Sequence, residues 1–146
     1  TSSWIDFAPA LDVKLQTGDD DELLGTGRTS VKPFFILSKN INHFTPHLNL
    51  GYEFNSGSEG QDRIVYIGGS DYGFGKGKHH FSVAFDIVGS HKVEESAIGN
   101  DIVDFSTGFK WSPHLGMLMF LNVQTPLNDD GLRADWTPTA GYELNF

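Results

Sequence analysis

The stretch Trp136–Phe146, which reads WTPTAGYELNF, decides how the rest of the chain is interpreted. Every second residue is apolar or aromatic, and the residues between them are polar or glycine. This period of two indicates an extended strand with one apolar face. Chain ends usually fray, so an alternating strand that continues to the last residue is unusual in a soluble protein. It is typical of a membrane barrel, whose last strand helps to complete the cylinder.

The composition fits that interpretation. The 146 residues suffice for one domain, and 17 Gly, 12 Phe, 4 Tyr and 3 Trp favour strands and turns over helices. No apolar run reaches the roughly 18 residues that a membrane helix needs. The lack of cysteine excludes disulfides and thiolate metal sites, and the net charge of -9 argues against nucleic acid as a partner.

The clearest alternation inside the chain covers residues 44–55. One face of this predicted strand carries Phe44, Pro46, Leu48, Leu50, Tyr52 and Phe54, and the other carries polar residues and glycine. The pattern continues for roughly ten residues, the length that a tilted strand needs to cross a bilayer. Similar patterns predict further strands over residues 5–15, 31–37, 64–74, 81–87, 103–111, 115–124 and 136–146.

The predicted fold is therefore all-β: an antiparallel up-and-down transmembrane β-barrel of about eight strands, with residues 1–146 as a single domain. An even number of strands places both chain ends on the same side of the membrane. Tight turns at 38–42 and 112–114 are expected on the periplasmic side. Longer loops at 16–29, 55–62, 89–100 and 125–132 are expected on the extracellular side, and 73–79 is longer than this alternation predicts.

Four prolines conflict with a closed barrel. Pro9, Pro33, Pro46 and Pro138 all fall inside predicted strands. Proline cannot donate a hydrogen bond to a ladder, and a closed barrel has no free edge on which to place it. Bulges or strand ends beyond the hydrogen-bonded region would have to accommodate these residues.

The C-terminal strand resembles the assembly signal of bacterial outer-membrane β-barrels. That signal reads polar, any, glycine, any, any, hydrophobic, any, aromatic, and Thr139, Gly141, Leu144 and Phe146 fill its four defined positions. The resemblance implies that these residues address the chain to the barrel-assembly machinery. An ordinary amphipathic strand is the alternative explanation of the same pattern.

Three further stretches resemble one family, the Gram-negative outer-membrane proteins assigned as transporters of the MetA pathway of phenol degradation. They are residues 17–27, 46–54 and 128–133, which read TGDDDELLGTG, PHLNLGYEF and NDDGLR. The resemblance implies an outer-membrane location, with membrane lipid and lipopolysaccharide as neighbours. Members are generally longer, so the chain is expected to be either a complete eight-stranded barrel or the C-terminal portion of a wider one.

The polar faces of the predicted strands carry charges of both signs. The predicted lumen-facing polar residues are Asp12, Lys14, Lys32, His47, Glu53, Asp86, Asp104, Lys110, Asp135 and Glu143. In a narrow eight-stranded barrel such charges must pair, and they would form a polar plug. In a wider barrel they would line water and disfavour the passage of anions.

Neither a cofactor nor catalysis is predicted. The acidic run Asp19, Asp20, Asp21 and Glu22 is a weak candidate for Ca²⁺ and lacks the order of an EF-hand loop, so a solvated loop is the expected reading. The histidines, including His43, His79, His80 and His114, have no diagnostic ligand spacing. Ser82, Asp86 and His80 share a strand face but are too far apart along it for a catalytic triad, so the chain is predicted not to be an enzyme.

Three functions remain open from the sequence. The first is an outer-membrane barrel with porin-like transport of small molecules, hydrophobic ones included. The second is a narrow, closed outer-membrane barrel with a structural, adhesive or complex-subunit role. The third is a soluble lipocalin-like barrel that binds lipid, which requires the apolar faces to point inward.

Overall fold

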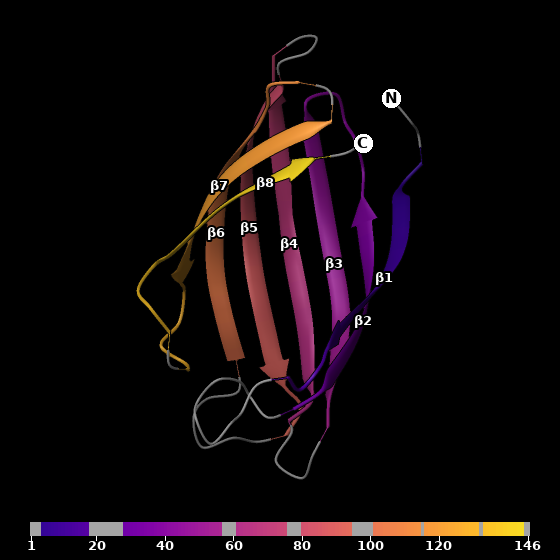
Figure 1. The fold of residues 1–146 in the computed structure, drawn as a ribbon, viewed down its shortest axis with the longest axis vertical. Coiled ribbons are helices and arrows are strands. Elements are labelled where there is room, and N and C mark those ends of the chain that lie inside the picture. The colour runs from indigo at the N-terminus through magenta and orange to yellow at the C-terminus, as the bar shows by residue number, and fades with distance from the viewer. Residues whose placement is uncertain are drawn as a thin grey trace.

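The computed structural model describes residues 4–17, 28–56, 61–75, 80–94, 101–114, 116–131 and 133–144. Eight strands pair in sequence order to form one antiparallel sheet (Figure 1). They are β1 (Asp6–Lys14), β2 (Ser30–Ser38), β3 (Phe44–Asn55), β4 (Arg63–Phe74), β5 (His80–Lys92), β6 (Asp101–Ser112), β7 (Met117–Pro126) and β8 (Thr137–Leu144). The predicted all-β class and the up-and-down order of eight strands are confirmed. Among the described residues, no helix is long and apolar enough to cross a membrane.

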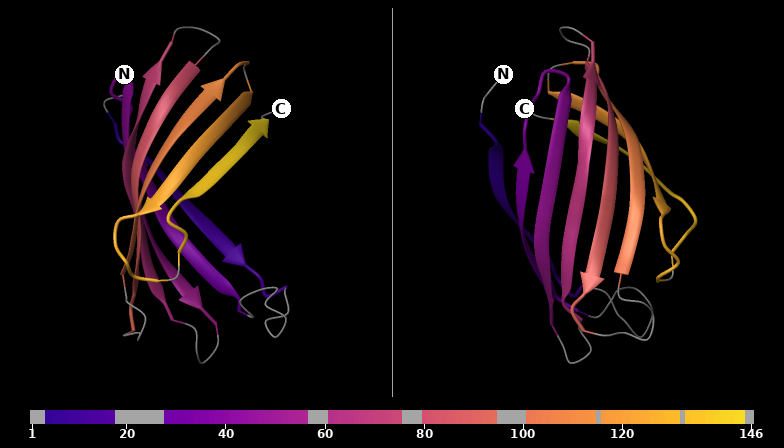
Figure 2. Two further views of the ribbon diagram at one scale, coloured as in Figure 1. Left: turned by 90° about the vertical axis from the view of Figure 1, so that its left-hand side faces the viewer. Right: turned by 180° about the vertical axis from the view of Figure 1, so that it is seen from behind.

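The sheet curls into a half-barrel and stays open (Figure 2). Its ladder begins at β1 and ends at β8, and within the described ranges no register joins these two strands. β1 and β8 are therefore edge strands, each with one unpaired side. Alternation in the sequence specifies which side chains share a face, but not how strongly eight strands curl, so it did not distinguish a closed ring from an open wall.

The open edges account for two of the four prolines. Pro9 lies on β1 and Pro138 lies on β8, and edge strands are where a sheet tolerates a residue without an amide proton. Pro33 lies on β2, which has a neighbour on both sides. There the β2–β3 register is interrupted between the pairs Val31–Phe54 and Phe34–Gly51. The sheet thus accommodates Pro33 at a local break in its hydrogen bonding.

Short and long connections lie at opposite ends of the sheet. The ends of β2, β4 and β6, which precede the short connections, lie at the upper end of the sheet in Figure 1. The ends of β1, β3, β5 and β7, which precede the longer connections, lie at the lower end. The connection 75–79 is short because β4 continues to Phe74, so it follows the alternation after all. The prediction of a loop from Gly89 was wrong, because β5 extends to Lys92.

Register divides the side chains between an outer face and an inner face, the latter lining the hollow of the sheet. The outer face carries exposed apolar residues, with Leu50 46%, Phe85 48% and Leu121 55% exposed. On the inner face, Asp104 is 6% and Ser106 is 5% exposed. Among the described residues, Ala84 is the only apolar residue that is buried. The described residues therefore point most of their exposed apolar surface away from the hollow and form no apolar core.

Aromatic rings gather on the outer face near the short connections. Tyr72 and Phe74 have ring centroids 4.8 Å apart, and Phe81 lies 5.6 Å from Phe109 and 6.0 Å from Trp111. These five residues form an aromatic band across β4, β5 and β6. Such bands mark the membrane interface in barrels that span bilayers.

Candidate functional site

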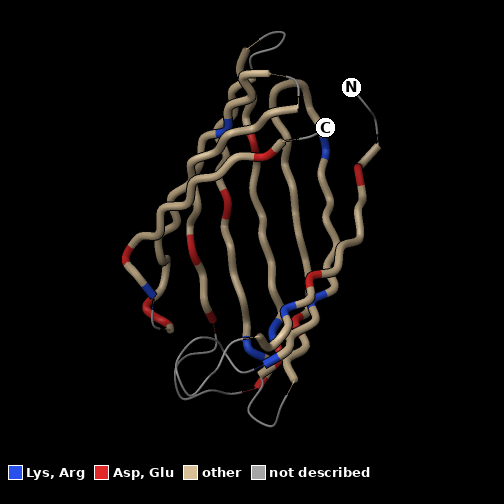
Figure 3. The backbone as a smooth tube through the Cα atoms, in the orientation of Figure 1, with Lys and Arg blue, Asp and Glu red and all other residues tan. Residues whose placement is uncertain are grey.

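The inner face is layered from one end of the strands to the other. Nearest the long connections is a charged row of Asp12, Lys32, Glu53, Arg63 and Lys92 on β1 to β5. An apolar band follows, with Phe34, Ile36, Val65, Ile67, Val88 and Ile102. A polar band lies beyond it, with His47, Asp71, Asp86, Ser106, Lys110, Asn122 and Gln124. Lys and Arg are visibly concentrated towards the lower ends of the strands (Figure 3).

A histidine between two carboxylates occupies the centre of the polar band. His47 Nε2 lies 2.8 Å from Asp86 Oδ1, and its Nδ1 lies 3.7 Å from Asp71 Oδ2. Lys110 Nζ donates to Asp71 Oδ1 at 2.7 Å. These side chains come from β3, β4, β5 and β6, so the contacts connect four strands on the hollow side of the sheet. A charge in this position is stabilised because it has a partner of opposite sign.

Gly69 makes the contact between His47 and Asp86 possible. It pairs with His47 on one side and with Asp86 on the other, so it lies directly between them in the sheet. A Cβ atom at this position would overlap the Asp86 carboxylate and the carbonyl oxygen of Phe85. The glycine therefore leaves the gap through which the imidazole and the carboxylate meet across β4.

We expect Gly69→Ala to lower the free energy of unfolding by about 1–3 kcal/mol, because the added methyl group overpacks the site and separates His47 from Asp86. The matched control is Gly68→Ala on the opposite face, where the nearest atom to the new Cβ is Leu48 Cδ1 at 3.9 Å. Urea unfolding of protein folded into lipid vesicles, followed by tryptophan fluorescence, measures both. Equal losses in the two variants would contradict a role for the gap.

A second group of contacts ties β6 to β7. Asn122 Nδ2 donates to Ser106 Oγ at 2.7 Å, and Gln124 Nε2 donates to Asp104 Oδ2 at 2.8 Å. All four residues lie on the inner face. The polar band thus contains hydrogen-bonded pairs between neighbouring strands as well as the contacts around His47.

Arg133 reaches this layer from the connection between β7 and β8. Its Nη1 donates to the Asp104 carboxylate, and its Nη2 donates to Asn128 Oδ1 at 2.7 Å. Asn128 Oδ1 also accepts from the backbone amide of Val103 at 3.1 Å. The side chains of Arg133 and Asp104 are only 15% and 9% exposed. The segment from Asn128 to Arg133 is therefore anchored against β6 by a buried ion pair.

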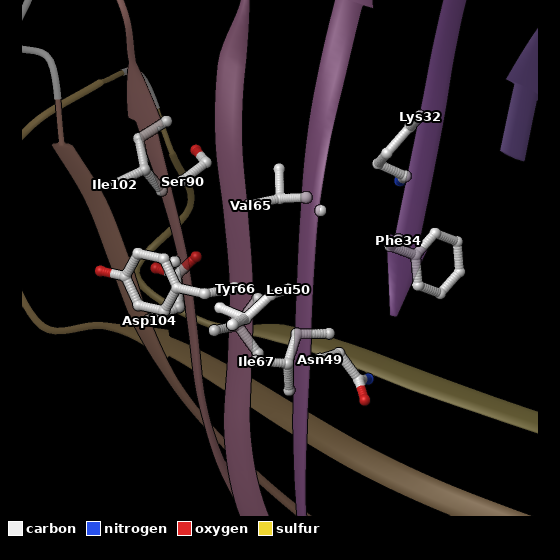
Figure 4. A pocket seen from close by; sticks show the side chains of 13 residues that line it. Lys32, Phe34, Asn49, Leu50, Val65, Tyr66, Ile67, Ser90, Ile102 and Asp104 are labelled. Carbon is white, nitrogen blue, oxygen red and sulfur yellow. The ribbon is translucent and has the colours of Figure 1, made fainter. Parts of the chain in front are cut away.

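The apolar band lines a cavity of about 270 Å³ that is open on one side of the inner face (Figure 4). Its walls include Phe34 from β2, Val65 and Ile67 from β4, Val88 from β5 and Ile102 from β6. Lys32 lies at one side and Asp104 at the other. Gly51 keeps the floor open, because a Cβ there would lie 2.7 Å from Phe34 Cβ and 3.1 Å from Val65 Cγ2.

One polar atom in this cavity has no partner. Asn49 lines the cavity, and its Oδ1 is buried without a hydrogen bond. A buried carbonyl oxygen left unpaired carries a cost in free energy, which a bound molecule or water relieves. The cavity therefore combines apolar walls with a few polar groups, the composition usual for small-molecule sites.

The structure places most of the predicted lumen-facing residues on the inner face. These are Asp12, Lys14, Lys32, His47, Glu53, Asp86, Asp104, Lys110 and Glu143. Asp135 differs: it lies before the first residue of β8 and is exposed. Of the predicted assembly signal, Thr139 and Gly141 lie on the inner face of β8 and Leu144 on its outer face. Phe146 lies outside the described residues.

The structure describes only some of the predicted metal candidates and does not group those that it describes. Asp19, Asp20, Asp21, Glu22 and His79 lie outside the described residues. His43, His80 and His114 are exposed. Across the residues that the structure does describe, no group of three or more His, Cys, Asp or Glu side chains is placed to hold a metal ion. The structure places Asp86 in contact with His47 on β3 rather than with His80 on its own strand.

Sequence reasoning missed Arg133 and Gly69. Arg133 appeared within the NDDGLR stretch, but a lone cation in a loop gives no signal that it folds onto a strand face. Gly69 lies in the glycine-rich middle of the predicted strand over 64–74, where glycines are more often ascribed to a weak strand than to a contact. The available signal for this contact was a glycine in an alternating strand. The two neighbouring strands carry a histidine and an aspartate at matching depth.

Comparisons with known proteins give no independent identification. A scan against protein-family models, a search of curated proteins and a search of solved structures each found no match to this chain.

Proposed function

We propose that this chain forms the wall of an outer-membrane β-barrel whose polar inner face lines a path for small molecules, hydrophobic ones included. The observation that carries the proposal is the direction of the apolar side chains. Leu50, Phe85 and Leu121 are about half exposed on the outer face, whereas charged residues pair on the inner face. A lipocalin-like barrel requires the reverse arrangement. Lipid in contact with the outer face would remove this apolar surface from water.

Three features support an outer-membrane location. The aromatic band lies at one end of the outer face, as it would at a membrane interface. Short and long connections alternate between the two ends. The C-terminal pattern of Thr139, Gly141, Leu144 and Phe146 resembles the signal read by the barrel-assembly machinery, and the chain resembles a family of outer-membrane transporters. Lipid and lipopolysaccharide would then be its neighbours.

The open sheet supports a lumen through which solutes pass, rather than a narrow lumen that a polar plug closes. A ring of eight strands is narrow enough for side chains to fill it. Here eight strands leave β1 and β8 unpaired with each other, so the same curvature requires more strands to complete a cylinder. The wider lumen that results would hold water, and the carboxylates of Asp71 and Asp86 would favour cations.

The first test asks which face meets lipid. The chain has no cysteine, so a single introduced cysteine can carry a fluorescent label without background. We expect a label at Phe85→Cys on the outer face to be quenched by brominated lipid, and a label at Ser82→Cys on the inner face of the same strand to be quenched by aqueous iodide instead. Quenching of both labels by iodide alone would contradict membrane residence and support a soluble barrel.

The second test asks whether the lumen is open. Folded protein in a planar bilayer should give discrete conductance steps, with a reversal potential that shows cation preference. Asp71→Asn combined with Asp86→Asn should reduce that preference, because two carboxylates on the inner face are neutralised. Protein that passes the lipid-quenching test but gives no steps would support the narrow barrel with a structural, adhesive or complex-subunit role.

A further inference from the structure

The cavity in the apolar band interrupts an otherwise polar inner face. Phe34, Val65, Ile67 and Ile102 contribute apolar walls from β2, β4 and β6, in a layer between the charged row and the polar band. If water fills the hollow, this apolar surface is hydrated at a cost that an apolar molecule of suitable size would relieve. A volume of about 270 Å³ is at the small end for ligand pockets, so the molecule must be small.

Cations border one side of this cavity. Lys32 lines it, with its Nζ 2.9 Å from Asp12 and 5.9 Å from the centroid of the Phe34 ring. Arg63 lies two residues before Val65 on the inner face of β4, and its Nε is buried without a hydrogen-bond partner. In the charged row, Lys32, Arg63 and Lys92 outnumber Asp12 and Glu53. This edge therefore favours a negatively charged group.

The opposite side of the cavity offers no competing charge. Asp104 lies there, but its carboxylate accepts hydrogen bonds from Arg133 and from Gln124. The ion pair of Asp104 with Arg133 is neutral overall, and the Asp104 carboxylate already has hydrogen-bond partners. Figure 4 shows Lys32 and Asp104 on opposite sides of the cavity. The cavity is thus asymmetric, with a cationic edge at Lys32 and a neutral edge at the ion pair of Asp104 with Arg133.

We propose that this cavity binds a small amphipathic anion, namely an aliphatic carboxylate of medium chain length. Its carboxylate lies against Lys32 and Arg63, and its chain lies along Phe34, Val65 and Ile102. The inference rests on the proposed function, because it requires the inner face to line a water-filled lumen. It assigns to that lumen a binding site for one chemical class of solute.

The probe is octanoate, added to the full chain folded in lipid nanodiscs, with protein-free nanodiscs as the reference for partitioning into lipid. Saturation-transfer NMR detects the bound fraction and requires no flow through the barrel. From butanoate to octanoate, we expect affinity to rise about fourfold for each added methylene until the cavity is full. Octanamide, a neutral molecule of similar shape, should bind at least tenfold more weakly than octanoate.

Two variants separate the site from the rest of the inner face. Lys32→Gln should weaken octanoate binding about tenfold and leave octanamide binding unchanged. The matched control is Lys110→Gln, which removes a cation from the polar band and should leave octanoate binding unaltered. Val65→Trp, which fills the cavity, should abolish binding of both probes. Folding of each variant is checked by circular dichroism.

Equal effects of Lys32→Gln and Lys110→Gln, octanamide binding as tight as that of octanoate, or a Val65→Trp variant that still binds would each overturn the proposal. The binding measurement does not use conductance, so failure of the site and failure of the pore can be told apart. Conductance steps without specific octanoate binding would remove the site and keep the pore. Specific octanoate binding without steps would keep the site and remove the pore.

Discussion

Asp104→Leu is expected to lower the free energy of unfolding by about 3–5 kcal/mol, because it leaves the guanidinium of Arg133 buried without its carboxylate. The Arg133 side chain is 15% exposed and also donates to Asn128. Arginine cannot lose its proton in a protein, so the uncompensated charge must be hydrated or moved. Either response detaches the segment from Asn128 to Arg133 from the inner face of β6.

The double variant Asp104→Leu with Arg133→Met tests whether stability depends on the charges of the ion pair or only on the volume that the two side chains fill. Replacing a buried ion pair by apolar residues of similar volume is often neutral. We therefore expect the double variant to regain most of the stability that Asp104→Leu loses. Urea unfolding in lipid vesicles of the unmodified chain, Asp104→Leu, Arg133→Met and the double variant gives the four free energies needed for a double-mutant cycle.

An exposed pair on the same face provides the control. Lys32 and Asp12 lie 2.9 Å apart, but their side chains are 30% and 55% exposed. Lys32→Met should change stability by less than about 1 kcal/mol. If Asp104→Leu lowers the free energy of unfolding no more than Lys32→Met does, then Arg133 does not hold the segment before β8. The contact between Arg133 and Asp104 would then make no measurable contribution to stability.

The strands and their faces could be predicted from the sequence because alternation is a local property. Leu48, Leu50, Phe81 and Phe85 lie on the outer face where their period of two placed them. Phe34 and Ile36, which alternation places on the inner face although they are apolar, belong to the apolar band. The pattern thus reported side-chain direction correctly even where the residue type was unexpected.

Features that depend on distant residues could not be predicted in this way. The gap at Gly69 depends on register across three strands, and the burial of Arg133 depends on how a loop folds over β6. Closure depends on curvature summed over the whole sheet, to which each residue contributes little. Pro9 and Pro138 did carry a signal, since proline is tolerated on edge strands, and the structure places both on edges.

Leu48→Lys should lower the free energy of unfolding in lipid vesicles by about 2–4 kcal/mol, because it places an ammonium group on the outer face near the middle of β3. Leu48 is 40% exposed, so in water its replacement would remove little packing. The cost arises from lipid, in which a charge far from the interface loses its hydration. The size of the effect therefore reports what surrounds the outer face.

The control for Leu48→Lys is Thr45→Lys, on the inner face of the same strand. Thr45 pairs in register with Asp71, so the added ammonium has a carboxylate neighbour and, in a water-filled lumen, retains hydration. We expect its cost to be below about 1 kcal/mol. A surface substitution in a soluble protein usually stays within about 0.5 kcal/mol. A Leu48→Lys variant that is no less stable than Thr45→Lys would mean that water, not lipid, meets the apolar face, and the proposed membrane barrel would have to be abandoned.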